Sequence, residues 1–396
     1  MRRMVLRTLG GVSAALLAAS GLVACEPEGC PDQSGVACVY IGTGELALGP
    51  DGLPARETEL YWAFDLEFAP DGRPYFLDWN NHLVRRVNTD GTVETIMGDF
   101  VGDGPIDQSD LVAPGAPGIE VSLNHPTDLQ FDPQGRLYLM AWHNHKVRVW
   151  DPETGLVTVM CGRGGGFGGD GSTDMSTVRF NQPKAIVRAT DGTLYILDQR
   201  NFLIRRIDAA TGMVTTLAGI APAPGTMPMP GYEGDGGPAL SARFRFEAGG
   251  NPEPSGGLAL DEENGILYVG DGLNFRIRAI DLATGTVDTV IGTGTSGYSG
   301  DGGPGASAQI SHVRDVEVGP DGLIYFADTE NHVVRAWDPE ADVVTTVAGT
   351  GTLGTGAEGQ AATATELNRP MGVAFGPDGT LYVADTYNSR FLRIPR

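Results

Sequence analysis

The chain has 396 residues, of which 41% are hydrophobic and 19% charged, and it contains 58 Gly and 26 Pro. This composition indicates a globular protein with many tight turns and argues against a mainly helical one. The formal net charge of −23 argues against a nucleic-acid partner, because phosphates need compensating Lys and Arg side chains.

The first 24 residues are predicted to be an export signal rather than part of the fold. Three Arg precede a short apolar run, which ends in small residues before a Cys. LVAC, residues 22–25, resembles the lipobox of bacterial lipoproteins. This resemblance implies that Cys25 is lipidated and tethers an exported protein to the cell envelope, at the outer membrane where the cell has one. An ordinary secretory signal cleaved nearby is the alternative.

Residues 25–37 are expected to form a linker that contains Cys30, which could form a disulfide with Cys38. Cys30 and Cys38 flank the short segment PDQSGVA, and outside the cytosol such a pair is expected to oxidise. Cys161 takes the place of an Ala in later repeats, so we interpret it as a small buried residue.

Six related segments follow along the chain, and each contains an Asn in a polar turn. Successive Asn residues lie 57 to 73 positions apart, at Asn81, Asn144, Asn201, Asn274, Asn331 and Asn388. Around each Asn the sequence predicts four short strands rich in Val, Ile, Tyr and Thr, joined by Gly, Asp and Asn turns. Such a unit is typical of a β-propeller blade. The expected units are 45–98, 99–162, 163–219, 220–292, 293–349, and 350–396 together with 38–44.

The last unit predicts how the ring closes. FLRIPR, residues 391–396, ends the chain before a fourth strand, whereas CVYIGTG, residues 38–44, matches the fourth-strand segment TVAGTG, residues 346–351. We therefore expect one all-β domain, residues 38–396, in which the N-terminal strand completes the sixth four-stranded antiparallel blade. Closure of this kind removes exposed sheet edges.

The turn pattern and the connectors resemble the NHL-repeat family. The pattern is Asp-x-x-Asn-His-x-[IV]-Arg, and the connector is GYSGDGGPGASAQI, residues 297–310. The resemblance implies a six-bladed propeller, which the strand count predicts independently. His82, His145 and His332 follow the Asn in only three units, so we interpret these turns as structural. We also interpret the acidic GDG turns as structural rather than as calcium sites, because a calcium site needs several oxygen ligands and each turn supplies one carboxylate. These turns contain Asp103, Asp170, Asp235 and Asp301, with Asp51 in a related turn.

The first strand of each blade, beside the central channel, holds the candidate metal ligands. Alignment of the units places Asp65, Asp128 and Asp315 at one level, and His125 and His312 three residues earlier. Carboxylates and imidazoles near the axis could hold Ca²⁺ or a transition metal. The alternative is that the acids bind water or Arg side chains in a wet channel.

The candidate recognition residues lie in loops that vary between units. AWHNHK replaces the repeated Asp with Ala141 and places Trp142 and His143 in that turn. The long connector of the fourth unit, residues 219–237, contains Met227, Met229 and Tyr232. Loops that grow on a constant scaffold often carry recognition, although drift of surface insertions is the alternative.

Two functions remain open at this point. The first is a monomeric, lipid-anchored module, in the periplasm or at the cell surface, that binds an envelope protein, peptide or glycan through its loop-rich face and has no catalytic residues. The second is a metal-dependent propeller lyase or lactonase at the channel mouth. HPTDL, residues 125–129, resembles the propeller lyases that cleave peptidyl-α-hydroxyglycine with a metal held by three His; this chain has two His at that position.

Overall fold

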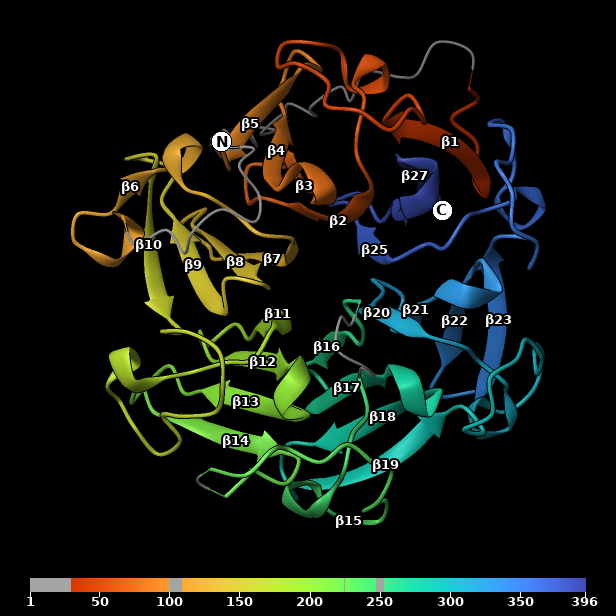
Figure 1. Ribbon diagram of the computed structural model, residues 1–396. Helices are drawn as coiled ribbons and strands as arrows, with labels where there is room; N and C mark the ends of the chain where they lie inside the picture. The colour runs from red at the N-terminus through yellow and green to blue at the C-terminus, as the bar shows by residue number, and fades with distance from the viewer. Residues whose placement is uncertain (1–29, 100–108, 224, 247–252) are drawn as a thin grey trace, which may run out of the picture.

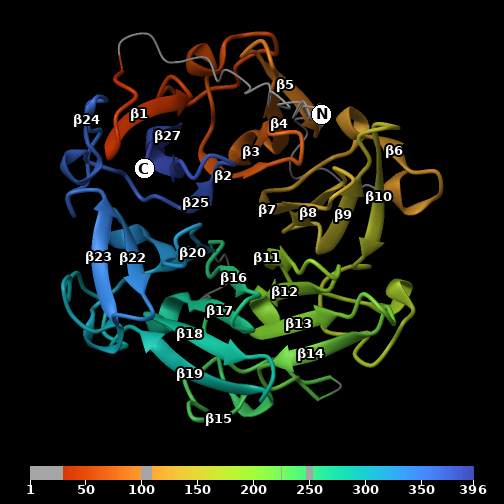
Figure 2. The same ribbon diagram turned by 180° about the vertical axis from the view of Figure 1, so that it is seen from behind.

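The computed structural model describes residues 30–99, 109–223, 225–246 and 253–396. Six antiparallel sheets stand around a central axis, as Figure 1 shows from one side and Figure 2 from the other. The predicted six-bladed β-propeller is therefore confirmed. The described segments contain short 3-10 turns and no α-helix. None of their helices is long and apolar enough to cross a membrane.

Five blades place their four main strands in sequence order from the axis outward, and in blade six the N-terminal β1 takes the fourth place. The innermost strands are β2 (Ala63–Phe68), β7 (Pro126–Phe131), β11 (Pro183–Arg188), β16 (Leu258–Asp261), β20 (Val313–Val318) and β25 (Gly372–Phe375). The second strands are β3 (Pro74–Asp78), β8 (Leu137–Ala141), β12 (Leu194–Asp198), β17 (Ile266–Asp271), β21 (Ile324–Asp328) and β26 (Leu381–Asp385). The third strands are β4 (Leu83–Val87), β9 (Lys146–Trp150), β13 (Leu203–Ile207), β18 (Arg276–Asp281), β22 (Val333–Asp338) and β27 (Arg390–Ile394). The fourth strands are β5 (Val93–Met97), β10 (Leu156–Cys161), β14 (Val214–Ala218), β19 (Thr286–Ile291), β23 (Val343–Ala348) and, in blade six, β1 (Val36–Ile41).

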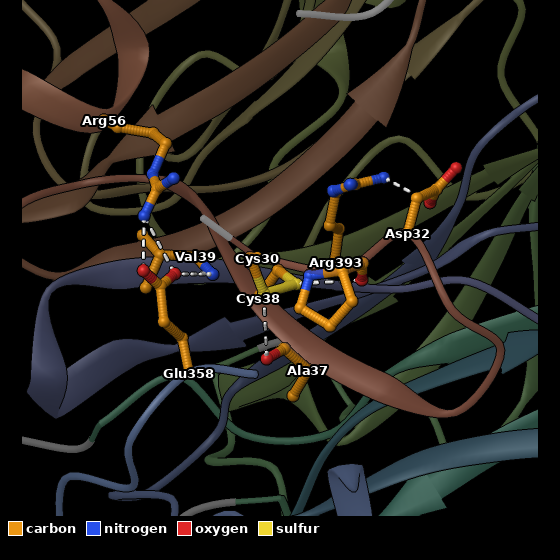
Figure 3. Close-up of a disulfide and its surroundings, with 9 residues drawn as sticks. Cys30, Asp32, Ala37, Cys38, Val39, Arg56, Glu358 and Arg393 are labelled. Atoms are coloured by element: carbon orange, nitrogen blue, oxygen red, sulfur yellow. Dashed lines mark hydrogen bonds and ion pairs between the residues drawn. A yellow bond between two sulfur atoms is a disulfide. The ribbon is translucent and has the colours of Figure 1, made fainter. Parts of the chain in front are cut away.

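The N-terminal strand closes the ring as predicted. β1 pairs antiparallel with β27, with Cys38 opposite Arg393, and Figure 1 shows these two strands in one blade. The strand begins at Val36, two residues before the predicted start, because Val36 also pairs with Ala361 on its other side. Cys30 and Cys38 form a disulfide next to this seam, as Figure 3 shows.

The outer edge strand of each blade is covered by a connector. In three blades this adds a fifth strand to the four that were predicted. Blades two, four and six gain a fifth, two-residue strand, namely β6 (Ala116–Pro117), β15 (Gly237–Pro238) and β24 (Gln360–Ala361). In the other blades the incoming connector donates a backbone hydrogen bond to the edge strand, for example from Gly302 N to Val344 O at 2.8 Å. Short 3-10 turns stand in the connectors at Ala55–Glu57, Ser109–Leu111, Gly118–Glu120, Met175–Thr177, Ala239–Ser241, Gly305–Ser307 and Ala362–Ala364. Edges covered in this way are protected from pairing with other chains.

The core lies between neighbouring blades, whose second and third strands are almost wholly buried on both faces. The innermost strands pack closely where their residues are small. A Cβ added to Gly372 would lie 2.4 Å from the Phe64 carbonyl oxygen, and one added to Gly257 would lie 2.7 Å from the Val316 nitrogen. This crowding accounts for the Ala and Gly at the level where three other blades carry Asp.

The GDG turns are fastened to the blades by buried arginines. Arg335 is fully buried, and its Nη2 lies 2.5 Å from Asp301 Oδ1. The other carboxylate oxygen of Asp301 accepts from Thr346 Oγ1 at 2.7 Å, on the edge strand β23. The same arrangement of Asp, Arg and Thr recurs around Asp51, Asp170 and Asp235. The carboxylates of these turns are thus occupied by structural bonds; Asp103 lies outside the described residues.

Candidate functional site

The repeated Asp and Asn residues build the turn between the second and third strands. The fifth blade shows the pattern: Asn331 Nδ2 donates to Asp328 Oδ2 at 2.9 Å and to the Gly297 carbonyl at 2.7 Å. Asp328 Oδ1 accepts from Ser311 N at 2.7 Å. The two side chains therefore hold the incoming connector against the turn. We define the turn face as the side of the ring that carries these turns and the starts of the innermost strands.

Blade two departs from this pattern because Ala141 stands where the other blades have Asp. Asn144 takes over part of the missing role, since its Oδ1 accepts from Asn124 N at 3.0 Å. Trp142 is buried, at 1% exposure, and its Nε1 donates to Gln199 Oε1 of blade three at 3.2 Å. Its ring belongs to the core between blades one and two, below the surface where recognition was expected, while His143 is only partly buried.

In four blades the residue after the turn Asn forms a bond to the next blade that sequence analysis missed. His82 Nδ1 accepts from the backbone nitrogen of His125 at 3.0 Å. His145 Nδ1 accepts from Gln182 N at 3.0 Å, and His332 Nδ1 accepts from Arg369 N at 3.1 Å. In the sixth blade Ser389 Oγ stands in the same place and accepts from Trp62 N at 3.4 Å. The sequence signal for these bonds was the polar residue that follows the turn Asn in four of the six units.

These histidine bonds predict a loss of stability in acid. Burial lowers the pKa of His145 and of His332, because the protonated ring is disfavoured there. A His with a lowered folded pKa contributes stability above its unfolded pKa, about 6.5, and loses it as the pH falls. We expect the double substitution His145→Phe, His332→Phe to cost about 1 kcal/mol per bond at pH 7 and less at pH 5.

Urea unfolding of the double variant and the natural chain at both pH values measures this effect. Ser389→Ala is the matched control, because it removes an equivalent bond whose acceptor does not titrate. Its cost should be the same at pH 7 and pH 5. A double variant with equal costs at the two pH values would contradict the prediction.

The channel contains a cavity of about 340 Å³ that is lined by five carboxylates. They belong to Asp65 and Glu67 of β2, Asp128 of β7, and Asp315 and Glu317 of β20. Asp65, Asp128 and Asp315 share one level, as the alignment predicted. Glu67 and Glu317 follow two positions later on the same strands, so the strand period of two could have found them.

Two of the predicted Asp residues bond to the next blade. Asp128 Oδ2 accepts from Ile186 N at 2.8 Å, and Asp315 Oδ2 accepts from Val373 N at 2.9 Å. Lys184 Nζ lies 3.9 Å from Asp315 Oδ1 and is the cation of this level that sequence analysis missed. In the alternative of a wet channel, the cation beside these acids is therefore Lys184 rather than the expected Arg side chains.

Burial and crowding raise the pKa values of these carboxyl groups. Burial, with added repulsion from Asp65 and Asp315, raises the pKa of Glu67 to about 8. Burial raises the pKa of Asp128 to about 8 although Lys184 acts in the opposite direction. The pKa values of Asp65 and Glu317 lie well above the ordinary range for the same reasons. The cavity therefore holds protons at neutral pH.

The five predicted metal ligands do not gather into one group. Within the described ranges, no three His, Cys, Asp or Glu side chains are arranged to hold a metal ion. His312 stands apart from the acids: its ring stacks on Phe275 at 5.9 Å, and its Nδ1 lies 3.8 Å from Glu330. A metal shared by Asp65, Asp128 and Asp315 stays a prediction.

Stacked rings form one arc of the channel mouth on the turn face. Trp62 stacks on Tyr387 at 4.5 Å and on Trp79 at 5.7 Å, and Trp79 contacts the His125 ring at 4.5 Å. The guanidinium of Arg369 lies over the Tyr387 ring, 4.6 Å from its centre. We call these five residues the aromatic arc; they join blades six, one and two.

Charged side chains form the adjoining arc. Arg369 Nη2 lies 2.5 Å from Glu330 Oε1 and 2.9 Å from Glu253 Oε2. The buried Arg314 pairs with Glu253 and donates to the Pro254 carbonyl. We call Glu253, His312, Arg314 and Glu330 the charged arc, and the two arcs together the rim. The rim presents guanidinium, carboxylate, imidazole and aromatic groups around one opening.

The fourth connector carries the remaining recognition candidates. Met227 is 81% exposed and Met229 is 66% exposed. Tyr232 is held in place: its hydroxyl donates to Asp235 Oδ2 at 2.5 Å and Arg276 lies 3.7 Å from its ring centre. The connector thus combines a fixed base with two protruding methionines.

Comparison with known proteins agrees with the fold. Residues 367–393 match the NHL repeat model. The chain is 28% identical over 274 residues to Protein SUPPRESSOR OF QUENCHING 1, chloroplastic, of Arabidopsis thaliana, covering 67% of this chain and 24% of that protein. It is 26% identical over 351 residues to NHL repeat-containing protein 2 of Homo sapiens, covering 71% of this chain and 46% of that protein. The chain thus spans less than half the length of these curated relatives.

Solved structures share the architecture at low sequence identity. An auxiliary nutrient binding protein from Bacteroides thetaiotaomicron VPI-5482 superposes with a TM-score of 0.62 at 15% identity, covering 90% of this chain and 75% of that one. Another from Bacteroides ovatus ATCC 8483 gives 0.60 at 16% identity, covering 91% and 76%. The NHL match and the NHL-repeat relatives support an NHL-type β-propeller.

Proposed function

We propose that this NHL-type propeller is an extracytoplasmic binding module, tethered by lipid at Cys25, whose turn face binds an envelope peptide, protein or glycan. The rim is the observation that carries the proposal. It combines Arg and aromatic side chains, the residue types enriched at binding hot spots, at the turn-face end of the innermost strands. The printed names of the two Bacteroides neighbours, auxiliary nutrient binding proteins, agree with a binding role.

The exposed methionines give the turn face a second contact area. Met side chains are unbranched and adapt to different partner surfaces. Met227 and Met229 protrude from a connector that Tyr232 and Asp235 anchor to blade four. A partner that covers the rim and this connector would bury apolar side chains without requiring the blades to move.

Export and tethering agree with the position of the disulfide. Residues 1–29, including Cys25, lie outside the described residues. Cys30 follows Cys25 by five positions and is bridged to Cys38, the bond expected of a protein in an oxidising compartment. A short tether of this kind would keep the propeller close to the membrane. The expected result of metabolic labelling with an alkyne fatty acid is incorporation that is lost in Cys25→Ser.

Binding is tested with purified protein carrying Cys25→Ser on arrays of envelope glycans and of peptides. For any ligand found, we expect Arg369→Ala to weaken binding at least tenfold, because it removes charge from one arc and a stacked group from the other. Arg73→Ala is the control: it changes an exposed pair with Asp71 in the turn after β2, at the opposite end of that strand. Binding that survives Arg369→Ala, or the absence of any ligand on either array, would contradict the proposal.

A further inference from the structure

Three polar atoms converge at the start of blade two, where the repeated Asp is missing. His125 Nδ1 and His143 Nδ1 lie 3.1 Å apart. Asn124 Oδ1 lies 2.8 Å from the first and 3.0 Å from the second. We call these three atoms the donor triangle. All three residues are partly buried and stand at the channel mouth, where His125 also belongs to the aromatic arc.

Hydrogen bonding satisfies the donor triangle only by bringing like groups together, for example when both imidazole N–H groups donate to the two lone pairs of Asn124 Oδ1. Each corner either presents a proton or presents a lone pair, and this holds also if the Asn124 amide is turned to present its nitrogen. With three corners and two kinds of group, at least two corners are always of the same kind. One edge of about 3 Å therefore always joins two lone pairs or two N–H groups, which repel. A cation bound by three lone pairs removes this conflict.

The imidazoles are held in place by packing. The His125 ring contacts the rings of Trp79 at 4.5 Å and His82 at 4.3 Å, and its Nε2 lies 3.2 Å from Asn80 Oδ1. His143 stacks on Trp142 at 4.0 Å. A metal-binding His usually donates from its other ring nitrogen to a carbonyl oxygen, because this bond directs the remaining lone pair at the metal. Asn80 can act in this way for His125.

The spacing and the donor types identify the class of ligand. Metal–imidazole bonds are about 2.0–2.1 Å long, so two ligands at a right angle lie about 3 Å apart, as all three edges do. Imidazole nitrogen favours zinc, nickel and copper, whereas Ca²⁺ prefers oxygen ligands. We propose that Asn124, His125 and His143 bind a divalent first-row transition metal at the channel mouth. This site differs from the predicted one, of which it keeps only His125, and it goes beyond the proposed binding of an envelope partner.

The experiment is a calorimetric titration of Ni²⁺ and Zn²⁺ into untagged, chelator-treated full chain carrying Cys25→Ser. We expect one equivalent to bind at pH 7.5 with a Kd below about 10 µM. At pH 5.5 the affinity should fall at least tenfold, because imidazole must be unprotonated to bind metal. The electron paramagnetic resonance spectrum of the Cu²⁺ complex should show coupling to two imidazole nitrogens.

Two matched variants decide whether the donor triangle is the site. His143→Phe keeps a ring to stack on Trp142 and should weaken metal binding at least tenfold. His145→Phe changes the neighbouring imidazole, which lies outside the triangle and has Phe in its place in two other blades, and should leave the affinity unchanged. Failure of the natural chain to bind either metal, or equal affinity in His143→Phe, would overturn the proposal. Neither result depends on whether an envelope partner binds.

Discussion

Replacing Arg335 with Met is expected to lower the free energy of unfolding by about 3–5 kcal/mol. The side chain is fully buried and joins three parts of blade five. It pairs with Asp301 of the connector, donates to the Gln309 and Ser299 carbonyls at 3.0 Å each, and lies 3.5 Å from the buried Asp328. Met fills similar volume but leaves Asp301 and Asp328 without their cation. The loss should therefore exceed that of an ordinary surface substitution.

Urea unfolding followed by tryptophan fluorescence measures the change, with the slope checked for constancy. Arg73→Met is the matched control: Arg73 also pairs with an Asp, at 2.5 Å, but on the surface. Exposed pairs contribute about 0–1 kcal/mol, so this variant should unfold almost like the natural chain. Equal effects of the two substitutions would show that burial of the GDG arginine does not matter.

Raising the pH from 5 to 8.5 is expected to lower the stability of the folded chain through its channel carboxyl groups. The double substitution Glu67→Gln, Glu317→Gln should remove part of this loss of stability. Both carboxyl groups have raised pKa values in the folded chain, to about 8 for Glu67. Between the unfolded value, about 4.3, and the folded value, the native state binds more protons than the unfolded state. Stability contributed by these groups therefore falls as the pH rises through that window.

The melting temperatures of the double variant and the natural chain provide the measurement. At pH 8.5 the variant should melt higher, by roughly 3 °C or more, and at pH 5 the difference should be clearly smaller. The control variant carries Glu153→Gln and Glu340→Gln, which change two exposed carboxylates and should not shift the difference between the pH values. A double variant that gains nothing at pH 8.5 would show that the channel tolerates the extra charge.

Much of the fold follows from features that repeat along the chain. Six Asn turns fix the number of blades, and the missing fourth strand of the last unit predicts closure by the N-terminus. The fifth strands were missed because Gly237–Pro238 and its equivalents have no strand propensity; they pair only because the connector passes an open edge. The level of Asp65, Asp128 and Asp315 followed from alignment, since equivalent positions of a repeat occupy equivalent places around the axis.

The candidate sites depended more on contacts between units. The bond from the His332 ring to Arg369 N crosses from one blade to the next, and no pattern within one unit predicts it. His125 and His143 are 18 positions apart, and their contact requires the turn and the strand start of blade two to meet. The burial of Trp142 likewise depends on Gln199 of blade three. Sequence patterns thus predicted the scaffold better than the groups at its opening.

The bridge between Cys30 and Cys38 has a mechanical consequence for a tethered protein. Without this disulfide, tension on the linker before Cys30 would first break the pairing of Val36 and Ala37 with Ala361 and Gln360. The rest of β1 would then separate. With it, the pull bypasses residues 31–37 and enters the strand at Cys38, opposite Arg393. Glu358 holds the next residue in place, because its carboxylate accepts from Val39 N at 3.1 Å and also pairs with Arg56 at 2.6 Å (Figure 3). If the chain is tethered at Cys25 as proposed, the covalent link would let that attachment carry load without separating β1 from the ring, starting at its end.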